Sequence, residues 1–311
     1  MRKSIKQIVF LFICLFSLIL GVSGGVLLRN YKDSKSVVFR ISSEKEVIDY
    51  DMLAALNFLQ YQFEKLGYTV LPWRYPGAYY HQRGDNAAIN VFIRGNAFFY
   101  DTRMNKNALN VYYLPRFFSM YAEEVQGYDY YISSQKNLQI ALNNRFDIAY
   151  LEEGAVPHKQ LKPQYKYDVL LISDELNKQY QEFTNQNYKA IYYTTLNFGK
   201  LSKKKKEELL SQARLVVYDK NLSPKNDKNY IPYAVYDIIS YGRPLLTNMI
   251  FDLYQNFGSY LYYFQNTEDM INQTKLSLAE KDDIREMKSS YARKKVISDS
   301  AVVKFSLPKK I

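Results

Sequence analysis

The chain has 311 residues and a formal net charge of +11, from 42 Lys and Arg against 31 Asp and Glu. Its single cysteine, Cys14, excludes an internal disulfide, and with two histidines the chain offers few ligands for a transition metal. The positive charge fits acidic lipid headgroups, phosphorylated ligands or nucleic acid, and by itself does not select among them.

The N-terminal segment differs from the rest of the chain. Residues 8–28 contain no charge and would form a helix of about 31 Å, enough to cross a bilayer core. After the basic flank 1–7, the sequence therefore predicts a single-pass transmembrane signal-anchor. Basic residues stand on both sides of it, so the orientation is weakly determined and only slightly favours an inside N-terminus. A cleaved signal peptide ending near residues 22–24 is the alternative.

The segment after the anchor is expected to form one α/β domain, residues 36–153. The β-branched run 36–41 predicts a strand, and apolar residues at helical spacing predict a helix over 50–66 that Gly67 ends. Further strands are predicted at 68–72, 88–93, 108–114, 128–132 and 146–151, with a helix over 136–144. This alternation is typical of a parallel sheet covered by helices.

A second α/β domain, residues 166–285, is expected after a linker at 154–165 that carries two prolines. Strands are predicted at 168–172, 190–193, 215–218, 243–247 and 261–263. Helices are predicted at 175–184, 203–213, 232–241 and 267–278, the last capped by Thr267, with a C-terminal helix or tail at 286–311. The fold class is thus two doubly wound, Rossmann-like domains that face each other across a cleft.

The most informative segment is 213–248, in which the helix AVYDIISYG (234–242) is followed by the strand RPLLT (243–247). It resembles the donor-binding half of GT-B glycosyltransferases, particularly the group that includes the spore-maturation protein CgeB. The resemblance implies that Asp237 accepts hydrogen bonds from the ribose hydroxyls of a nucleotide sugar, and that Lys220 neutralises phosphate. It also places the following residues at the donor: Tyr233, Asn229, Tyr230, Ser173 and Gly242.

Two positions depart from the family pattern. Ala234 stands where the family has an arginine that would pair with phosphate, and Asn229 stands where retaining families have a glutamate. These departures favour an alternative, a non-catalytic GT-B-like protein that binds a glycan or a partner protein. A periplasmic-type ligand-binding protein, which also closes two α/β domains on a ligand, is a third reading.

The first domain offers candidates for a catalytic base. His81, Asp85 and Glu153 could each deprotonate a sugar hydroxyl if they face the cleft, although residues of these types in loops are more often solvated surface groups. His158 falls in the linker and is interpreted as an ordinary linker residue. Weaker resemblance to the same family extends over 128–134, 148–154 and 168–173.

Other chemistries lack a signature in this sequence. There is no Walker loop, dinucleotide-binding glycine motif, His-Glu-x-x-His or Gly-x-Ser-x-Gly. GT-B enzymes generally work without a bound metal, so neither a metal nor another cofactor is expected. The basic run 203–206 is followed by two glutamates, which opposes nucleic-acid binding. We therefore predict a membrane-anchored glycosyltransferase that moves a sugar from a nucleotide or lipid-linked donor to a glycan or lipid-linked acceptor.

Overall fold

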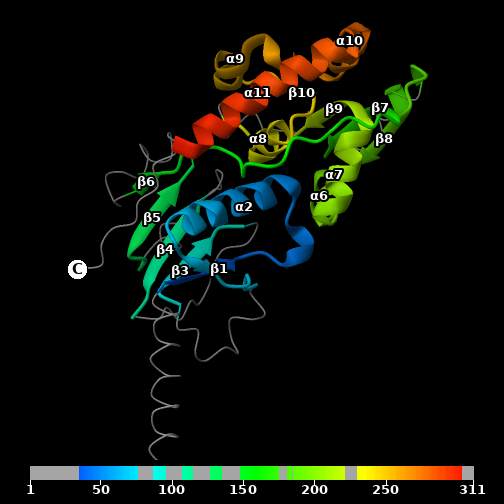
Figure 1. Cartoon of the computed structure of the whole chain (residues 1–311). Helices are drawn as coiled ribbons and strands as arrows, with labels where there is room; N and C mark the ends of the chain where they lie inside the picture. Colours follow the sequence, from blue (N-terminus) through cyan, green and yellow to red (C-terminus); the bar gives the residue numbers. More distant parts are fainter. Residues whose placement is uncertain are drawn as a thin grey trace, which may run out of the picture.

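The computed structural model describes residues 35–75, 87–95, 107–114, 127–134, 148–174, 181–183, 185–220 and 230–302. Their strands form two sheets, one of six strands within residues 36–150 and one of five within residues 167–264. Every strand pairing in both sheets is parallel. Figure 1 shows the two sheets in separate halves of the molecule, with α2 between them. The prediction of two parallel α/β halves is confirmed.

The first half contains the six-stranded sheet, in the order β2-β1-β3-β4-β5-β6. Its strands are β1 (Ser36–Ile41), β2 (Thr69–Val70), β3 (Ile89–Ile93), β4 (Leu109–Leu114), β5 (Tyr130–Ser133) and β6 (Ile148–Tyr150). All residues of β3 and β4 are buried, as expected for parallel strands whose two faces are both covered. The short η1 (Lys45–Val47) leads into α2 (Tyr50–Lys65), whose N-cap Asp49 accepts a bond from the Met52 amide at 2.8 Å.

The second half contains the five-stranded sheet, in the order β11-β10-β9-β7-β8. Its strands are β7 (Tyr167–Ser173), β8 (Ala190–Tyr193), β9 (Ala213–Asp219), β10 (Leu245–Asn248) and β11 (Tyr262–Phe264). In each sheet the first strand along the chain lies between the second and the third. Each sheet therefore has a topological switch point, where the order in which strands are added reverses. Ligands of such sheets bind beyond the carboxyl ends of the strands at this point.

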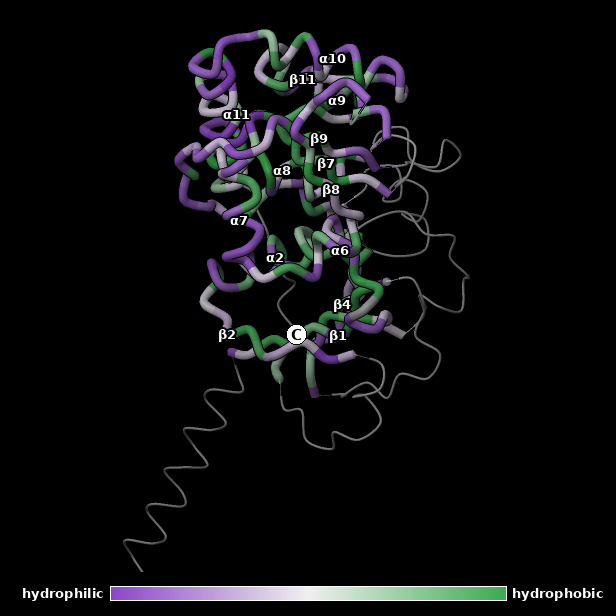
Figure 2. The backbone as a smooth tube through the Cα atoms, turned by 90° about the vertical axis from the view of Figure 1, so that its right-hand side faces the viewer, coloured by the Kyte–Doolittle hydropathy of each residue, from purple (hydrophilic) through white to green (hydrophobic). Residues whose placement is uncertain are grey.

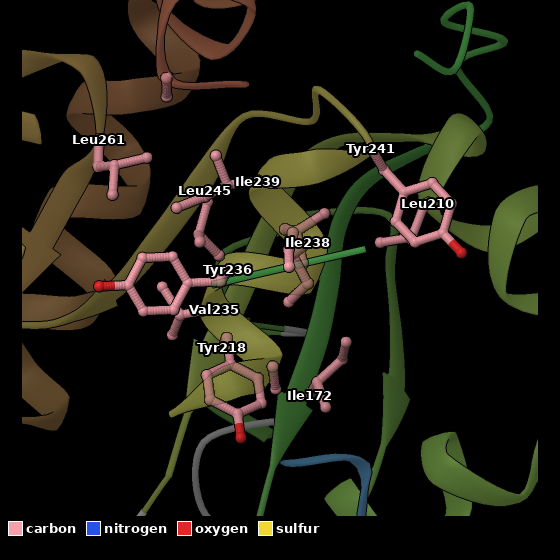
Figure 3. Packing of buried hydrophobic residues seen from close by; sticks show 14 of the residues in the cluster. Ile172, Leu210, Tyr218, Val235, Tyr236, Ile238, Ile239, Tyr241, Leu245 and Leu261 are labelled. Atoms are coloured by element: carbon pink, nitrogen blue, oxygen red, sulfur yellow. The ribbon is translucent and has the colours of Figure 1, made fainter. Parts of the chain in front are cut away.

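The helices of the second half surround its sheet. They are α6 (Thr195–Lys200), α7 (Lys203–Gln212), α8 (Tyr233–Ser240), α9 (Phe251–Phe257), the short η3 (Gly258–Tyr260), α10 (Thr267–Ala279) and α11 (Asp282–Val302). Figure 2 shows largely hydrophobic strands inside and predominantly hydrophilic α10 and α11 outside. All eight residues of α8 are buried, and Figure 3 shows Val235 and Ile238 packed beside Ile172 and Tyr218 of the sheet.

The predicted strands and the helices α2, α7, α8 and α10 are found within two residues of their expected ends. The cap prediction for α10 is wrong, because Asn266 rather than Thr267 accepts the bond from the Asp269 amide, at 2.9 Å. The helices α6 and α9 were not predicted, since six or seven residues are too few for a clear periodicity. The helix predicted at 136–144 lies outside the described residues.

The two halves are connected at two places. Residues 151–166 run from β6 to β7 without regular structure, and α11 returns from the second half to the first. At its far end, Ser300 Oγ accepts a bond from the Ala155 amide at 3.0 Å, and Lys65 Nζ donates to the Ala301 carbonyl at 3.0 Å. In Figure 1 this red end of α11 lies beside the first sheet. The return of the chain therefore fastens the C-terminal helix to α2 and to the linker.

The predicted membrane anchor, residues 8–28, lies outside the described residues and stays a prediction. Within the described ranges, no helix is both long enough and apolar enough to cross a membrane. The longest of them, α11, has 21 residues and includes charged groups along its length.

The junction of linker, α2 and α11 gives a test of the packing. A Cβ at Gly154 would lie 2.7 Å from Phe58 Cζ and 2.8 Å from Ser300 Oγ, so Gly154→Ala should destabilise the chain by about 1–3 kcal/mol through overpacking. Gly67→Ala is the control, because its Cβ meets nothing within 4 Å and only the backbone at φ +80° is strained, at about 1–2 kcal/mol. Denaturant unfolding of both variants measures this. An unchanged midpoint for Gly154→Ala would contradict the close packing.

Candidate functional site

The N-terminal turn of α2 connects the first half to the second. The helix starts with three consecutive residues, Asp49, Tyr50 and Asp51. Each of their side chains bonds to a residue of the second half, either Lys220 or Asp237. The helix itself packs against α8 and α6. The N-cap bond of Asp49 to the Met52 amide fixes where the helix begins, and thereby fixes the direction of all three side chains.

The carboxylate of Asp51 is the centre of the first cluster. Its side chain is 1% exposed and that of Lys220 is 9% exposed, and Lys220 Nζ donates to Asp51 Oδ2 at 2.9 Å. The Tyr230 hydroxyl donates to the same oxygen at 2.8 Å, and the Ala234 amide donates to Asp51 Oδ1 at 3.3 Å. A buried carboxylate requires such partners, because an unpaired charge in the interior is costly. One cation, one hydroxyl and one helix amide thus converge on a single anionic group.

Lys220 has a second acidic neighbour. Its amine lies 3.3 Å from Asp49 Oδ2, so two carboxylates of the α2 turn face one ammonium group. Lys220 directly follows β9, and its backbone amide donates to Asn248 Oδ1 at 3.2 Å. The side chain of Lys220 is therefore held at the carboxyl end of the second sheet, where the topology places a ligand.

Asp237 is the centre of the second cluster. Tyr50 donates its hydroxyl to Asp237 Oδ2 at 2.7 Å, and His158 Nε2 lies 2.9 Å from Asp237 Oδ1. Burial, followed by the charge of Asp237, raises the pKa of Tyr50 well above its ordinary value, so the hydroxyl stays protonated and donates. Lys206 Nζ lies 5.4 Å from the centroid of the Tyr50 ring, and burial lowers the pKa of Lys206.

His158 is held in place from three directions. Its ring stacks on that of Tyr241, with centroids 4.0 Å apart and an interplanar angle of 4°. Arg293 of α11 donates to the carbonyl of His158 and, at 2.9 Å, to the carbonyl of Ser240. The bond to Asp237 completes the set. His158 therefore attaches the linker to both α8 and α11.

Tyr233, the first residue of α8, extends from the second half into the first. Its ring is fully buried, 5.9 Å from that of Phe58, and belongs to the core of the first half. Its hydroxyl bonds with Ser134 Oγ at 2.5 Å, and the Tyr113 hydroxyl donates to it at 3.4 Å. Burial raises the pKa of Tyr113 to about 12, which keeps that hydroxyl protonated near neutral pH. Tyr233 thus connects the halves in two ways, through its ring on Phe58 and through its hydroxyl on Ser134.

A third polar group lies at the switch point of the second sheet. Ser173 ends β7 and Asp219 ends β9, and Ser173 Oγ donates to Asp219 Oδ2 at 3.3 Å. Asn248, at the end of β10, donates its amide to Asp219 Oδ1 at 2.9 Å. Next to them, Thr195 at the start of α6 bonds Asp174. These side chains close the carboxyl edge of the sheet beside Lys220.

The structure brings three of the expected donor residues to the start of α2: Asp237, Lys220 and Tyr230. Tyr233 packs on Phe58, two turns further along the helix. Ser173 lies at the neighbouring strand end, and Gly242 ends α8 with φ +72°. Glu153 accepts a bond from Tyr150 at 2.9 Å, and its charge contributes to the raised pKa of Tyr233 after burial and Tyr113. His81, Asp85 and Asn229 lie outside the described residues. The donor and base roles expected of all these residues stay predictions.

Tyr50, Asp51 and His158 were not identified from the sequence. Asp49 and Asp51 have the pattern of an acidic helix start, which accounts for them without any site. His158 was interpreted as an ordinary linker residue, and its contact with Asp237 spans 79 positions of sequence. Among the described residues, no group of three or more His, Cys, Asp or Glu side chains is placed to hold a metal ion.

The Asp51–Lys220 pair gives a test of the contact between the halves. Lys220→Met leaves the Asp51 carboxylate buried without its cation and should destabilise the chain by about 3–5 kcal/mol. Adding Asp51→Asn removes the stranded charge and should recover part of the loss. The exposed Lys205–Glu208 pair provides the control, because Lys205→Met should change the unfolding midpoint little. Equal midpoints for wild type and Lys220→Met in denaturant would contradict this account of the pair.

Comparison with known proteins identifies the fold. No family model and no curated protein matches the sequence. An α-glucosyltransferase in complex with UDP-glucose and DNA containing an abasic site is similar in structure, with a TM-score of 0.50 at 10% identity over 84% of this chain and 94% of that one. The DNA-modifying enzyme β-glucosyltransferase has a TM-score of 0.47 at 13% identity, over 86% of this chain and 95% of that one. TarM of S. aureus gives 0.43 at 12%, over 68% of this chain and 52% of TarM, so the chain spans about half of TarM. At these identities the likeness shows the fold alone, which is the two-domain GT-B fold of glycosyltransferases.

Proposed function

We propose that this protein is a glycosyltransferase that transfers a sugar from a nucleotide-sugar donor to a glycan or lipid-linked acceptor. The observation that carries the proposal is the placement of Lys220 and Asp237. They are separated in sequence, yet both lie against the first turn of α2, beside the carboxyl edge of the second sheet. A cation so placed can neutralise the diphosphate of a sugar nucleotide, and a carboxylate can accept hydrogen bonds from its neutral ribose hydroxyls.

Each group has a specific part in this proposal. Lys220 Nζ, the Tyr230 hydroxyl and the Ala234 amide would bind the diphosphate, because all three already direct their hydrogens at one anionic point. The amide belongs to the first turn of α8, whose dipole favours negative charge there. Asp237, one turn further along α8, would accept bonds from the ribose hydroxyls. We place Asn229, Tyr233, Ser173 and Gly242 around the same donor, as the resemblance of this segment implies.

The structural likeness supports a nucleotide-sugar donor in this proposal. The α-glucosyltransferase of similar structure was determined with UDP-glucose. A uridine diphosphate sugar is therefore the first donor to test, with a lipid-linked sugar as the alternative. The base that activates the acceptor would come from the first half, where His81, Asp85 and Glu153 are the candidates. A carboxylate or imidazole within hydrogen-bond reach of the acceptor hydroxyl is what this step needs.

A non-catalytic GT-B-like protein is the second candidate function. The observation that favours it is that both oxygens of Asp237 bond within the chain, to Tyr50 and to His158. Ala234, in place of the arginine of the resembling family, points the same way. Turnover of a UDP-sugar into free UDP in the presence of a glycan acceptor distinguishes an enzyme from a binding protein.

Calorimetric titration of the full-length chain with UDP tests the donor site. Asp237→Ala and Lys220→Ala should each weaken UDP binding about tenfold or more, since each removes a charge-assisted hydrogen bond. Asp283→Ala is the control, because this carboxylate is exposed on α11 and belongs to neither cluster. UDP affinity that is undiminished in both site variants would rule out this donor site.

We also propose that residues 8–28 anchor the protein in a membrane, with the N-terminus inside. The uncharged 21-residue run supports the anchor, and the amino group beside the basic flank supports the orientation. The chain should stay in the membrane fraction after alkaline carbonate washing and should keep its full mass. A shorter mass ending near residues 22–24 would instead show a cleaved signal peptide. Reporter fusions at the C-terminus determine the side.

A further inference from the structure

The first turn of α2 bonds to every described group that the proposed function assigns to the diphosphate and to the ribose. We propose that this turn, residues 49–51, competes with the donor and holds the protein in an autoinhibited state until the donor displaces it. The inference rests on the proposed function, because it concerns regulation of that same site. It is carried by the contacts of three consecutive residues, each with a partner across the two halves.

The acidic residues of the turn resemble the diphosphate in charge and in hydrogen bonding. Asp51 accepts bonds from Lys220, Tyr230 and the Ala234 amide, the three donors that would bind a phosphate. Asp49 places a second carboxylate 3.3 Å from the same amine. Carboxylate and phosphate oxygens are both anionic acceptors, so they compete for the same donors. A diphosphate and this turn therefore cannot bind Lys220 in the same manner at the same time.

Tyr50 resembles the ribose in the second cluster. Its hydroxyl donates to Asp237 Oδ2 at 2.7 Å, which is the type of bond a ribose hydroxyl would make to that carboxylate. The Asp237 side chain is 11% exposed, and Tyr50 is almost fully buried against it. Because Tyr50 and Asp51 are adjacent in sequence, the two contacts with the second half belong to one structural unit. A movement of this turn that frees Lys220 also frees Asp237.

The remaining contacts of α2 do not depend on this turn. Phe58, two turns further along the helix, packs on Tyr233, and Lys65 at the C-terminal end bonds Ala301. These contacts lie outside the first turn, so the rest of the helix can keep its neighbours when the turn is displaced. Displacement must also withdraw the Tyr50 ring from Phe198 and Tyr218 of the second half. A donor that binds only the displaced state has its apparent affinity reduced in proportion to the population of that state. Weakening the turn's contacts should accordingly tighten donor binding.

The test measures UDP affinity by calorimetry in full-length variants of the turn. Tyr50→Phe keeps the ring and removes only the bond to Asp237, and Asp51→Asn removes the charge facing Lys220 while Asp49 remains. Each should bind UDP about tenfold more tightly than wild type, and the double variant more tightly still. Two variants away from the turn are matched controls. Tyr262→Phe removes a tyrosine–carboxylate bond of 2.7 Å, as Tyr50→Phe does. Glu286→Gln removes the charge that faces buried Arg243, as Asp51→Asn removes the charge that faces Lys220.

Hydrogen exchange of the α2 amides provides a second test, because displacement of the turn by UDP should speed their exchange. If UDP displaces the turn, amides 50–54 of α2 should exchange faster with saturating UDP, whereas those of α8 should slow. Amides of α2 that slow or stay unchanged, or variants that bind UDP no more tightly than wild type, would overturn the proposal. If Asp237→Ala and Lys220→Ala lose UDP binding while the turn variants bind UDP with wild-type affinity, the competition proposal is wrong and the proposed donor site is retained. Unchanged affinity in Asp237→Ala and Lys220→Ala contradicts the donor site itself.

Discussion

The burial of one carboxylate, that of Asp51, determines how the two halves of this protein meet. Its side chain is 1% exposed, so its charge must be met by protein groups rather than by water. Those groups come from the end of β9, from Tyr230 and from the first turn of α8. The start of α2, the end of the central strand and the start of a fully buried helix therefore meet at this one buried charge.

Much of the fold was predictable from the sequence, because parallel strands covered on both faces are continuous apolar runs and leave a strong local signal. The runs at 36–41 and 190–193 became β1 and β8 with the same ends. The helix α8 was found through its resemblance to a known motif, which also drew attention to Asp237. The partners of Asp237 were out of reach, since Tyr50 is 187 positions away and contacts between halves leave no periodic pattern. The six-residue α6 was missed because it is shorter than two turns.

The abundance of tyrosine, with 31 residues, also finds part of its explanation in this contact. Tyr112, Tyr113, Tyr218 and Tyr233 are fully buried and so contribute to packing. Tyrosine suits a junction of two domains because its ring adds apolar area while its hydroxyl satisfies a polar group. Tyr50 and Tyr233 do so in opposite directions, one entering the second half and the other the first.

The two connections between the halves meet at one place, where the Ala155 amide bonds Ser300 of α11. Two neighbouring attachments act as a hinge, which permits rotation about a single axis and resists sliding or free tumbling of one lobe against the other. A rotation of one whole half against the other, as distinct from displacement of the α2 turn alone, would then pivot near residues 155 and 300. Because Arg293 of α11 also holds the linker at His158, α11 and the linker would rotate together as one rigid connection between the halves.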